Sequence, residues 1–308
     1  MMDDLPLDTN HPAVRDYLKL VRLQVLTPLS LLINIATVMV ATLVMSPNLG
    51  TIANLYPSSI APKPYMIAVY IVMIYLGQIG YCVLLVLARK PETKRTLVKG
   101  VGLPLVFANW LMAGWAIAWL FQAFLVSTIL LGILLVFLIY ANVVLLIYHP
   151  PTRERPFDIA LIHAPMRAFL ILPLNDLFWF SLFITLGWTW SPGEPQHYGR
   201  HQWAGFIVVL SVNLLGLVVI ALRRDIVWCV AATWICASIW SLDPKPFPVW
   251  VVVIAFTVLH PLALVSSWLW LKLRGRHAKE GQIQLPPDQQ EEEGARGPRE
   301  VDAEALWG

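Results

Sequence analysis

The sequence predicts an all-α membrane protein, a polytopic bundle of eight transmembrane helices with both termini in the cytoplasm. Of its 308 residues, 58% are hydrophobic and 13% are charged, about half the charged share of a soluble domain. The charges are also absent from long runs, which read as membrane spans. These runs are 23–62, 64–88, 100–151, 203–222 and 246–271. The connections between successive spans contain alternately many and few basic residues. Because basic residues accumulate on the cytoplasmic side, this alternation gives the predicted orientation.

The first four spans follow from length, because a helix needs about 20 residues to cross a hydrocarbon core of about 30 Å. The first covers about 24–46 and is followed by a loop whose prolines stop the helix. The second covers about 65–88. The 48 uncharged residues of 101–148 would make a helix of roughly 72 Å. That length suits two spans, divided by a hairpin at Gln122.

The last four spans are predicted at about 164–187, 203–222, 226–242 and 249–271. Only Arg223, Arg224 and Asp225 separate the sixth span from the seventh. Such a short connection is typical of an antiparallel helix pair.

The distribution of lysine and arginine supports both the number of spans and their direction. Of the 22 basic residues, 19 fall on the side of the N-terminus, and the other side carries only Lys63, Arg200 and Lys245. Because basic residues accumulate on cytoplasmic flanks, both termini are predicted to be cytoplasmic. Eight of the 14 tryptophans lie at predicted span ends, where the amphipathic indole ring is favoured.

The predicted organisation has three parts. Residues 1–22 form a cytoplasmic N-terminal segment, and 23–272 form the eight-helix transmembrane domain. Residues 273–308 are rich in charge, Gly, Pro and Gln. Their apolar residues are too sparse for a core, so a disordered cytoplasmic tail is expected.

Asp176 is the first candidate site residue, because a charged group near the bilayer midplane is costly and usually faces a protein interior. It lies about twelve residues into the fifth span and follows Asn175. His260 lies about halfway along the eighth span, before Pro261, at a similar depth. Asp176 and His260 either bind a ligand or relay protons, or each is a structural residue hydrogen-bonded to a neighbouring helix.

Amide side chains form a second layer of candidates within the spans. Gln78, Asn109 and Asn213 lie in the second, third and sixth spans, with Trp110 beside Asn109. Asn34 and Asn142 occupy the first and fourth spans. Such amides either join helices by hydrogen bonds or provide the polar groups of an aromatic-lined pocket.

The polar stretch 149–167 contains two histidines and two carboxylates, but their spacing matches no known metal site. Its prolines predict a stiff cytoplasmic loop. The sequence contains no nucleophile elbow, phosphate-binding loop, dinucleotide fingerprint or zinc-protease motif. We therefore expect neither a metal nor another cofactor. The net charge of +3 favours no nucleic-acid partner.

Four segments carry a family resemblance. They are LYPSSIAPKPYMIAVYIVMIYLGQIGYCVL, ANWLMAGWAIAWL, LPLNDLFWFSLFITLGW and WAGFIVVLSVNLLGLVVIALRRDIVW. Over about 24–272 the chain resembles fungal multi-pass membrane proteins that form a family of unknown function. Its layout is similar to that of long relatives of the tryptophan-rich sensory proteins, which are TspO-like. Short members have five spans and bind porphyrins or sterols, so the resemblance implies a pocket for a lipophile. Asn109, Trp110 and the Pro-rich loop before the second span correspond to them.

We therefore expect a non-enzymatic integral membrane protein that binds or transports a small lipophilic molecule within its bundle. Its expected partners are the lipid bilayer and this ligand; the sequence indicates no oligomeric state. One alternative is a membrane enzyme acting on lipids or isoprenoids, with acid and base drawn from His149, Asp158, His163 and Asp176. Another is a structural or adaptor protein that acts through its C-terminal tail.

Overall fold

The computed structural model describes residues 12–152 and 154–280, and all regular elements within these ranges are helices. The predicted all-α class is therefore confirmed. The chain forms two compact units that divide after Leu264. The features below belong to the first unit, apart from the last part of α12. The predicted tail beyond residue 280 lies outside the described residues.

The helices follow one another with short connections. In the first half they are α1 (Pro12–Met39), α2 (Leu49–Leu55), α3 (Pro64–Leu87), α4 (Pro91–Arg95), α5 (Gly102–Leu120) and α6 (Phe124–Tyr148). In the second half they are α7 (Pro156–Asp158), α8 (Ala164–Leu172), α9 (Phe178–Thr185), α10 (Gln202–Arg223), α11 (Ile226–Trp240) and α12 (Phe247–Glu280). Four π-helical turns adjoin them: η1 (Val40–Val44), η2 (Thr96–Val101), η3 (Ile159–His163) and η4 (Pro173–Leu177). A 3₁₀ turn, η5 (Pro195–Gly199), precedes α10.

Within the described residues, seven helical stretches are long and apolar enough to cross a membrane. They are Tyr17–Val44, Pro64–Leu87, Pro91–Leu120, Phe124–Tyr148, Pro156–Thr185, Gln202–Arg223 and Phe247–Leu273. α11 is apolar but has only 15 residues. Its length is therefore about 22 Å, against a hydrocarbon core of about 30 Å. The crossing predicted at 226–242 thus stays a prediction.

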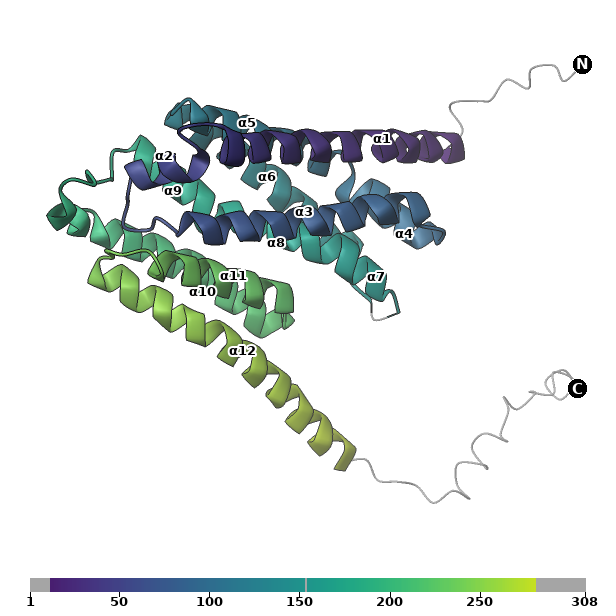
Figure 1. Cartoon of the computed structure of the whole chain (residues 1–308). Coiled ribbons are helices and arrows are strands. Elements are labelled where there is room, and N and C mark those ends of the chain that lie inside the picture. Colours follow the sequence, from purple (N-terminus) through teal and green to yellow (C-terminus); the bar gives the residue numbers. More distant parts are fainter. Residues whose placement is uncertain (1–11, 153, 281–308) are drawn as a thin grey trace, which may run out of the picture. The chain divides into compact units, whose positions relative to one another are not determined.

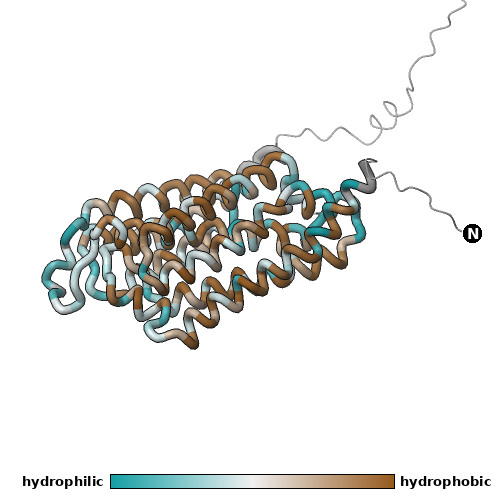
Figure 2. Tube along the Cα trace, turned by 90° about the horizontal axis from the view of Figure 1, so that it is seen from above, coloured by the Kyte–Doolittle hydropathy of each residue, from teal (hydrophilic) through white to brown (hydrophobic). Residues whose placement is uncertain are grey.

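The connections between helices gather at two ends of the first unit. At one end, here called the basic end, Thr93 bonds Asp158, Thr96 contacts His149, and Arg167 pairs with Asp225. At the opposite end, the Tyr56 hydroxyl bonds Gln122 and the Lys63 amide bonds the Ser238 carbonyl. Figure 2 shows hydrophilic residues gathered at these ends and hydrophobic residues along the helices between them.

The interior is built from helices that are close in space but not always in sequence. α5 packs between α1 and α6, and α8 packs against α3, α6 and α11 (Figure 1). On α6, Leu131, Leu134 and Leu138 are completely buried. Their spacing of three and four residues places them on one helical face, which explains how one stripe of α6 fills the core.

The segment Pro156–Thr185 is helical throughout, whereas a loop was predicted as far as residue 163. Pro156 occupies the first turn of α7, where a missing N–H costs nothing. The π turn η3 directly precedes α8, whose first turn contains Pro165, and η4 begins at Pro173. Proline cannot donate to the preceding turn and crowds its carbonyl. A widened π turn accommodates the missing hydrogen bond, so these prolines lie within one long helical segment instead of ending it.

Candidate ligand site

Asp176 lies inside the bundle in the π turn η4, where only 1% of its surface is exposed. Neither carboxylate oxygen has a hydrogen-bond partner among the residues that the structure describes. π turns are frequent at functional sites, because the extra residue displaces side chains from the regular helical position. A buried carboxylate without hydrogen bonds is energetically costly, so its environment must compensate it.

Lys245 is a buried basic residue that interacts electrostatically with Asp176. It follows α11 in the connection to α12, is 9% exposed, and interacts electrostatically with both Asp176 and Asp243. Its ammonium group donates a hydrogen bond to the Ala61 carbonyl. Burial lowers the pKa of Lys245, and the two carboxylates oppose that shift. Because α11 is short, the connection after it brings this lysine to the buried carboxylate.

Asn175 adds a second polar group beside Asp176. It is 5% exposed, and neither its amide nitrogen nor its oxygen has a hydrogen-bond partner. Consecutive helical residues point in different directions, so the amide and the carboxylate occupy adjoining sectors of η4. This turn is surrounded by α6, α10 and α11. The arrangement therefore places an amide, a carboxyl group and a nearby lysine in an apolar interior.

His260 has different neighbours from Asp176. Its Nε2 lies 3.3 Å from the Asn213 carbonyl oxygen, and its ring is 5.4 Å from that of Phe256. The Asn213 side chain accepts from Cys236 and donates to the Val209 carbonyl. These contacts join α10, α11 and α12. Nδ1 of His260 is buried and has no hydrogen-bond partner among the described residues. The basic residue that interacts with Asp176 is Lys245.

Asn34 and Asn109 form a hydrogen-bonded group with Tyr75 between α1, α3 and α5. Asn34 donates to Asn109 over 3.0 Å and accepts from the Tyr75 hydroxyl over 3.1 Å. Gln78 is 1% exposed, and its amide has no partner. Tyr75 and Gln78 are three residues apart on α3 and so share a face. The network ties three helices together, as amides between membrane helices do.

Trp110 lies on the outer surface of α5, although Asn109 beside it is completely buried. Trp110 is 44% exposed, and its ring contacts Phe107 edge-on at 6.0 Å. The aromatic residues inside the first unit include Trp115 and Trp119, whose ring centroids are 5.9 Å apart. Trp119 also contacts Phe180 on α9. The interior therefore has the expected aromatic groups, but Trp110 is not among them.

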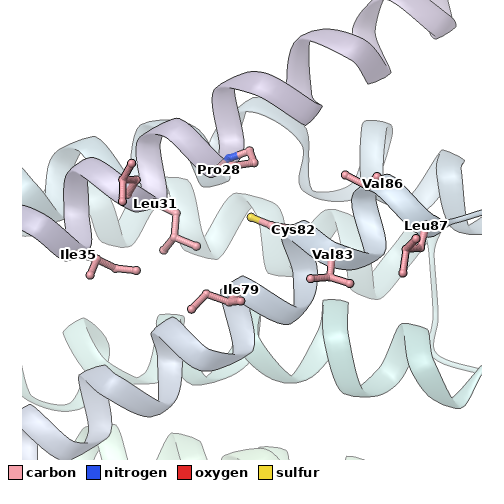
Figure 3. A pocket seen from close by; sticks show the side chains of 9 residues that line it. Pro28, Leu31, Ile35, Ile79, Cys82, Val83, Val86 and Leu87 are labelled. Atoms are coloured by element: carbon pink, nitrogen blue, oxygen red, sulfur yellow. The ribbon is translucent and has the colours of Figure 1, made fainter.

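Two apolar crevices open on the surface of the helices. One, of about 600 Å³, lies between α1 and α3 and is lined by apolar residues and Cys82. Figure 3 shows Leu31 and Ile35 of α1 directed toward Ile79 and Cys82 of α3. The other, of about 580 Å³, is the α3–α8–α11 crevice. Its lining is Val69, Tyr70, Met73, Ile74, Gly77, Ala160, Ala164, Pro165, Ala168, Ile226, Val227, Val230, Ala231 and Trp234.

The charged groups of the basic end are largely paired. Arg155 lies 3.3 Å from Asp158 and 3.8 Å from Glu92. His163, predicted in a loop, is 3% exposed inside η3. Within the described part of the chain, no three His, Cys, Asp or Glu residues are grouped to hold a metal. The acidic residues at this end thus hold arginines in place.

These features define a polytopic membrane protein that has a polar site enclosed by apolar helices. Residues 24–268 match the model of a family described as TSPO-like protein. Because the match covers most of the chain, the chain belongs to the TSPO-like protein family. The predicted TspO-like layout is thereby confirmed. No curated protein and no solved structure matches the chain.

Proposed function

We propose that this protein binds a small lipophilic molecule with a weakly polar group, such as a hydroxyl, inside its helix bundle. The observation that supports this proposal is the Asp176 carboxyl group, buried in η4 without a hydrogen-bond partner in the described part of the chain. The ligand hydroxyl donates to Asp176, and Asn175 is placed to contribute a second polar contact. In this proposal the apolar part of the ligand lies between the surrounding helices, because apolar walls with few polar groups are usual in ligand sites.

Energetics favour a bound molecule over an empty site. A hydrogen bond to a charged group contributes about 1.5–3 kcal/mol, and leaving a buried polar group unpaired costs a similar amount. A neutral ligand that satisfies Asp176 therefore gains affinity by removing an existing penalty. The proposal is one of binding or transport and includes no chemical conversion of the ligand.

The proposed topology includes α11 as an eighth crossing, with the basic end in the cytoplasm. The loop contacts at the two ends fit consecutive helices that alternate in direction. In this arrangement Lys245 enters from the non-cytoplasmic side. Its burial beside Asp176 explains why a basic residue is found on a side with few of them.

The test is saturation binding of two probes, a radiolabelled sterol and a porphyrin, to purified protein in detergent. These probes follow from the family resemblance. We expect at least one to bind the natural protein, and Asp176→Asn to weaken it about tenfold, because the substitution replaces one carboxyl oxygen with an amide group that cannot accept a hydrogen bond. The Asn substitution keeps the side-chain size.

Asn142→Ala is the matched control. Asn142 is also a midspan amide, but its donors already bond the Leu138 and Met166 carbonyls. It should leave the affinity unchanged. Equal binding by the natural protein and Asp176→Asn would refute the assignment of the site, and failure of both probes to bind the natural protein would count against the ligand class.

A further inference from the structure

We infer that Lys245 determines which polar group the Asp176 site accepts, because its amino group donates to the same ligand oxygen that donates to Asp176. An oxygen that both accepts and donates is a hydroxyl, so the site selects an alcohol over a ketone. This inference rests on the proposed function and adds a second contact to it. Its evidence is a lysine and a carboxyl group that interact in an apolar interior without bonding each other.

The amino group of Lys245 is held in place by the connection between α2 and α3. It donates to the carbonyl of Ala61, a residue that is itself buried. The Ala61 amide bonds the Ser58 carbonyl over 3.1 Å, which closes a turn. The Lys63 amide bonds the Ser238 carbonyl of α11 over 2.9 Å. Packed backbone therefore fixes the position of the amino group before a ligand binds.

Lys245 retains a hydrogen-bond donor after its contact with Ala61. An ammonium group has three N–H donors, and a neutral amine has two. Among the described residues, the Ala61 carbonyl is the acceptor at hydrogen-bond distance from this amino group. At least one N–H thus remains in either protonation state. A buried donor of this kind is costly unless another acceptor satisfies it.

Asp176 supplies the matching acceptor from a different element. It interacts electrostatically with Lys245, although neither of its oxygens bonds a group in the described part of the chain. The two groups are therefore separated by more than the length of one hydrogen bond. An oxygen that bonds both groups spans about 4.5–5.5 Å between them. A single ligand hydroxyl in this position accepts from Lys245 and donates to Asp176.

Asn175 is the competing donor, because its side chain is also buried and has no partner among the described residues. It directly precedes Asp176 in η4, and neighbouring side chains of a helical turn point in different directions. An oxygen bonded to Asp176 therefore lies away from Asn175. Lys245 approaches Asp176 from the connection between α11 and α12, which does not constrain it in this way.

The test is competition against a radiolabelled sterol by three unlabelled sterol analogues that differ at one carbon, with the full chain in detergent. The analogues are the alcohol, the corresponding ketone and the corresponding hydrocarbon. The ketone accepts a hydrogen bond but donates none, and the hydrocarbon does neither. We expect about a fivefold loss of affinity from alcohol to ketone and again from ketone to hydrocarbon, because each step removes one hydrogen bond.

The results in the natural protein separate this inference from the proposed function. Equal affinities for the ketone and the hydrocarbon, with alcohol binding still weakened by Asp176→Asn, would overturn the inference and leave the proposed function standing. If the sterol does not bind at all, the ligand class of the proposed function is wrong and the inference falls with it.

Two variants identify the donor. Lys245→Met removes the amino group and should abolish the advantage of the ketone over the hydrocarbon, while the alcohol still binds most tightly through Asp176. Asn175→Ala should weaken all three analogues alike and keep that advantage. Asn142→Ala, at an amide whose donors are already bonded, should change nothing.

A ketone advantage that survives Lys245→Met, or that disappears in Asn175→Ala, would overturn the inference. If Lys245→Met does not fold, the natural protein and Asn175→Ala together decide between the two donors.

Discussion

Asp176 and Lys245 are two ionisable residues in an apolar interior, and each affects the electrostatics of the other. Each is buried, and they interact electrostatically without a direct hydrogen bond. The attraction compensates part of the cost of removing two charges from water, and the Ala61 carbonyl satisfies one ammonium donor. The carboxylate retains unfilled acceptor positions, which is why we place the ligand there.

Replacing only one member of this pair should destabilise the protein strongly. Lys245→Met removes the ammonium group that interacts electrostatically with Asp176 and donates to the Ala61 carbonyl, so the melting temperature should fall. The double variant Asp176→Asn with Lys245→Met should recover most of that loss, because no charge then remains. Thermal unfolding in detergent measures the effect, with Lys63→Met as the control at a partly buried lysine. A double variant no more stable than Lys245→Met alone would disprove the pairing.

His149 should make the basic end sensitive to acid. Burial, Arg155 and other nearby cations lower its pKa below 6.5. Above pH 6.5 the imidazole is neutral in both folded and unfolded chains, but below it the unfolded chain binds the proton more readily. Folding stability should therefore fall as the pH drops through this range. His149→Gln should flatten the fall in melting temperature between pH 7.5 and 5.5; an identical slope in both proteins would contradict this.

At the scale of elements, close approach at glycine determines how helices and loops pack. A Cβ added to Gly205 of α10 would lie 2.3 Å from the Ser59 hydroxyl and 3.2 Å from Ile60 Cγ2. The connection between α2 and α3 therefore packs directly on the α10 backbone. A Cβ on Gly114 of α5 would lie 3.5 Å from Leu130, an ordinary contact distance.

Gly205→Ala and Gly114→Ala should accordingly differ in stability. Gly205→Ala forces the loop away from α10 and should cost about 1–3 kcal/mol, as overpacking does. Gly114→Ala adds a good helix former in available space and should be neutral or stabilising. The measurement is the melting temperature of each variant in the same detergent. Equal melting temperatures would show that the loop adjusts without cost.

The sequence predicted the long apolar helices well, because their charge-free runs directly reflect the lipid environment. It did not predict the π turns at Ile159–His163 and Pro173–Leu177. Those turns depend on how a proline is accommodated within a packed helix. For the same reason His163 was expected in a loop. Outward exposure of Trp110 also could not be deduced, since helical periodicity is weak when almost all positions are apolar.

At the scale of the whole molecule, topology and site are linked through Lys245. From sequence, Lys245 was one of three basic residues counted on the sparse side, which gave no reason to place it inside. Asp176 and Asn175 were predicted because polar groups are rare within spans. The proximity of Lys245 could not be predicted, because it depends on how the short helix α11 and the connection after it are arranged in space. The short length of α11 was the only available signal.

Cysteine accessibility should establish whether α11 crosses the membrane. The background is a variant without its three native cysteines. Single cysteines at Glu92 and Arg223 should react with an impermeant maleimide from one side of sealed vesicles. Cysteines at Glu194 and Asp243 should react only from the other side. If the cysteine at Asp243 instead reacts together with that at Arg223, α11 does not cross, and the proposed eight-span topology is wrong.

The central claim is that the unfilled acceptor positions of Asp176 are ligand positions. An experimental structure in lipid nanodiscs measures this most directly, through the density beside the two carboxylate oxygens. We predict non-protein density larger than a water molecule, at a hydrogen-bond distance of about 2.5–3.2 Å from one of them. Carboxylate oxygens bonded only to protein groups or to isolated waters would contradict the claim.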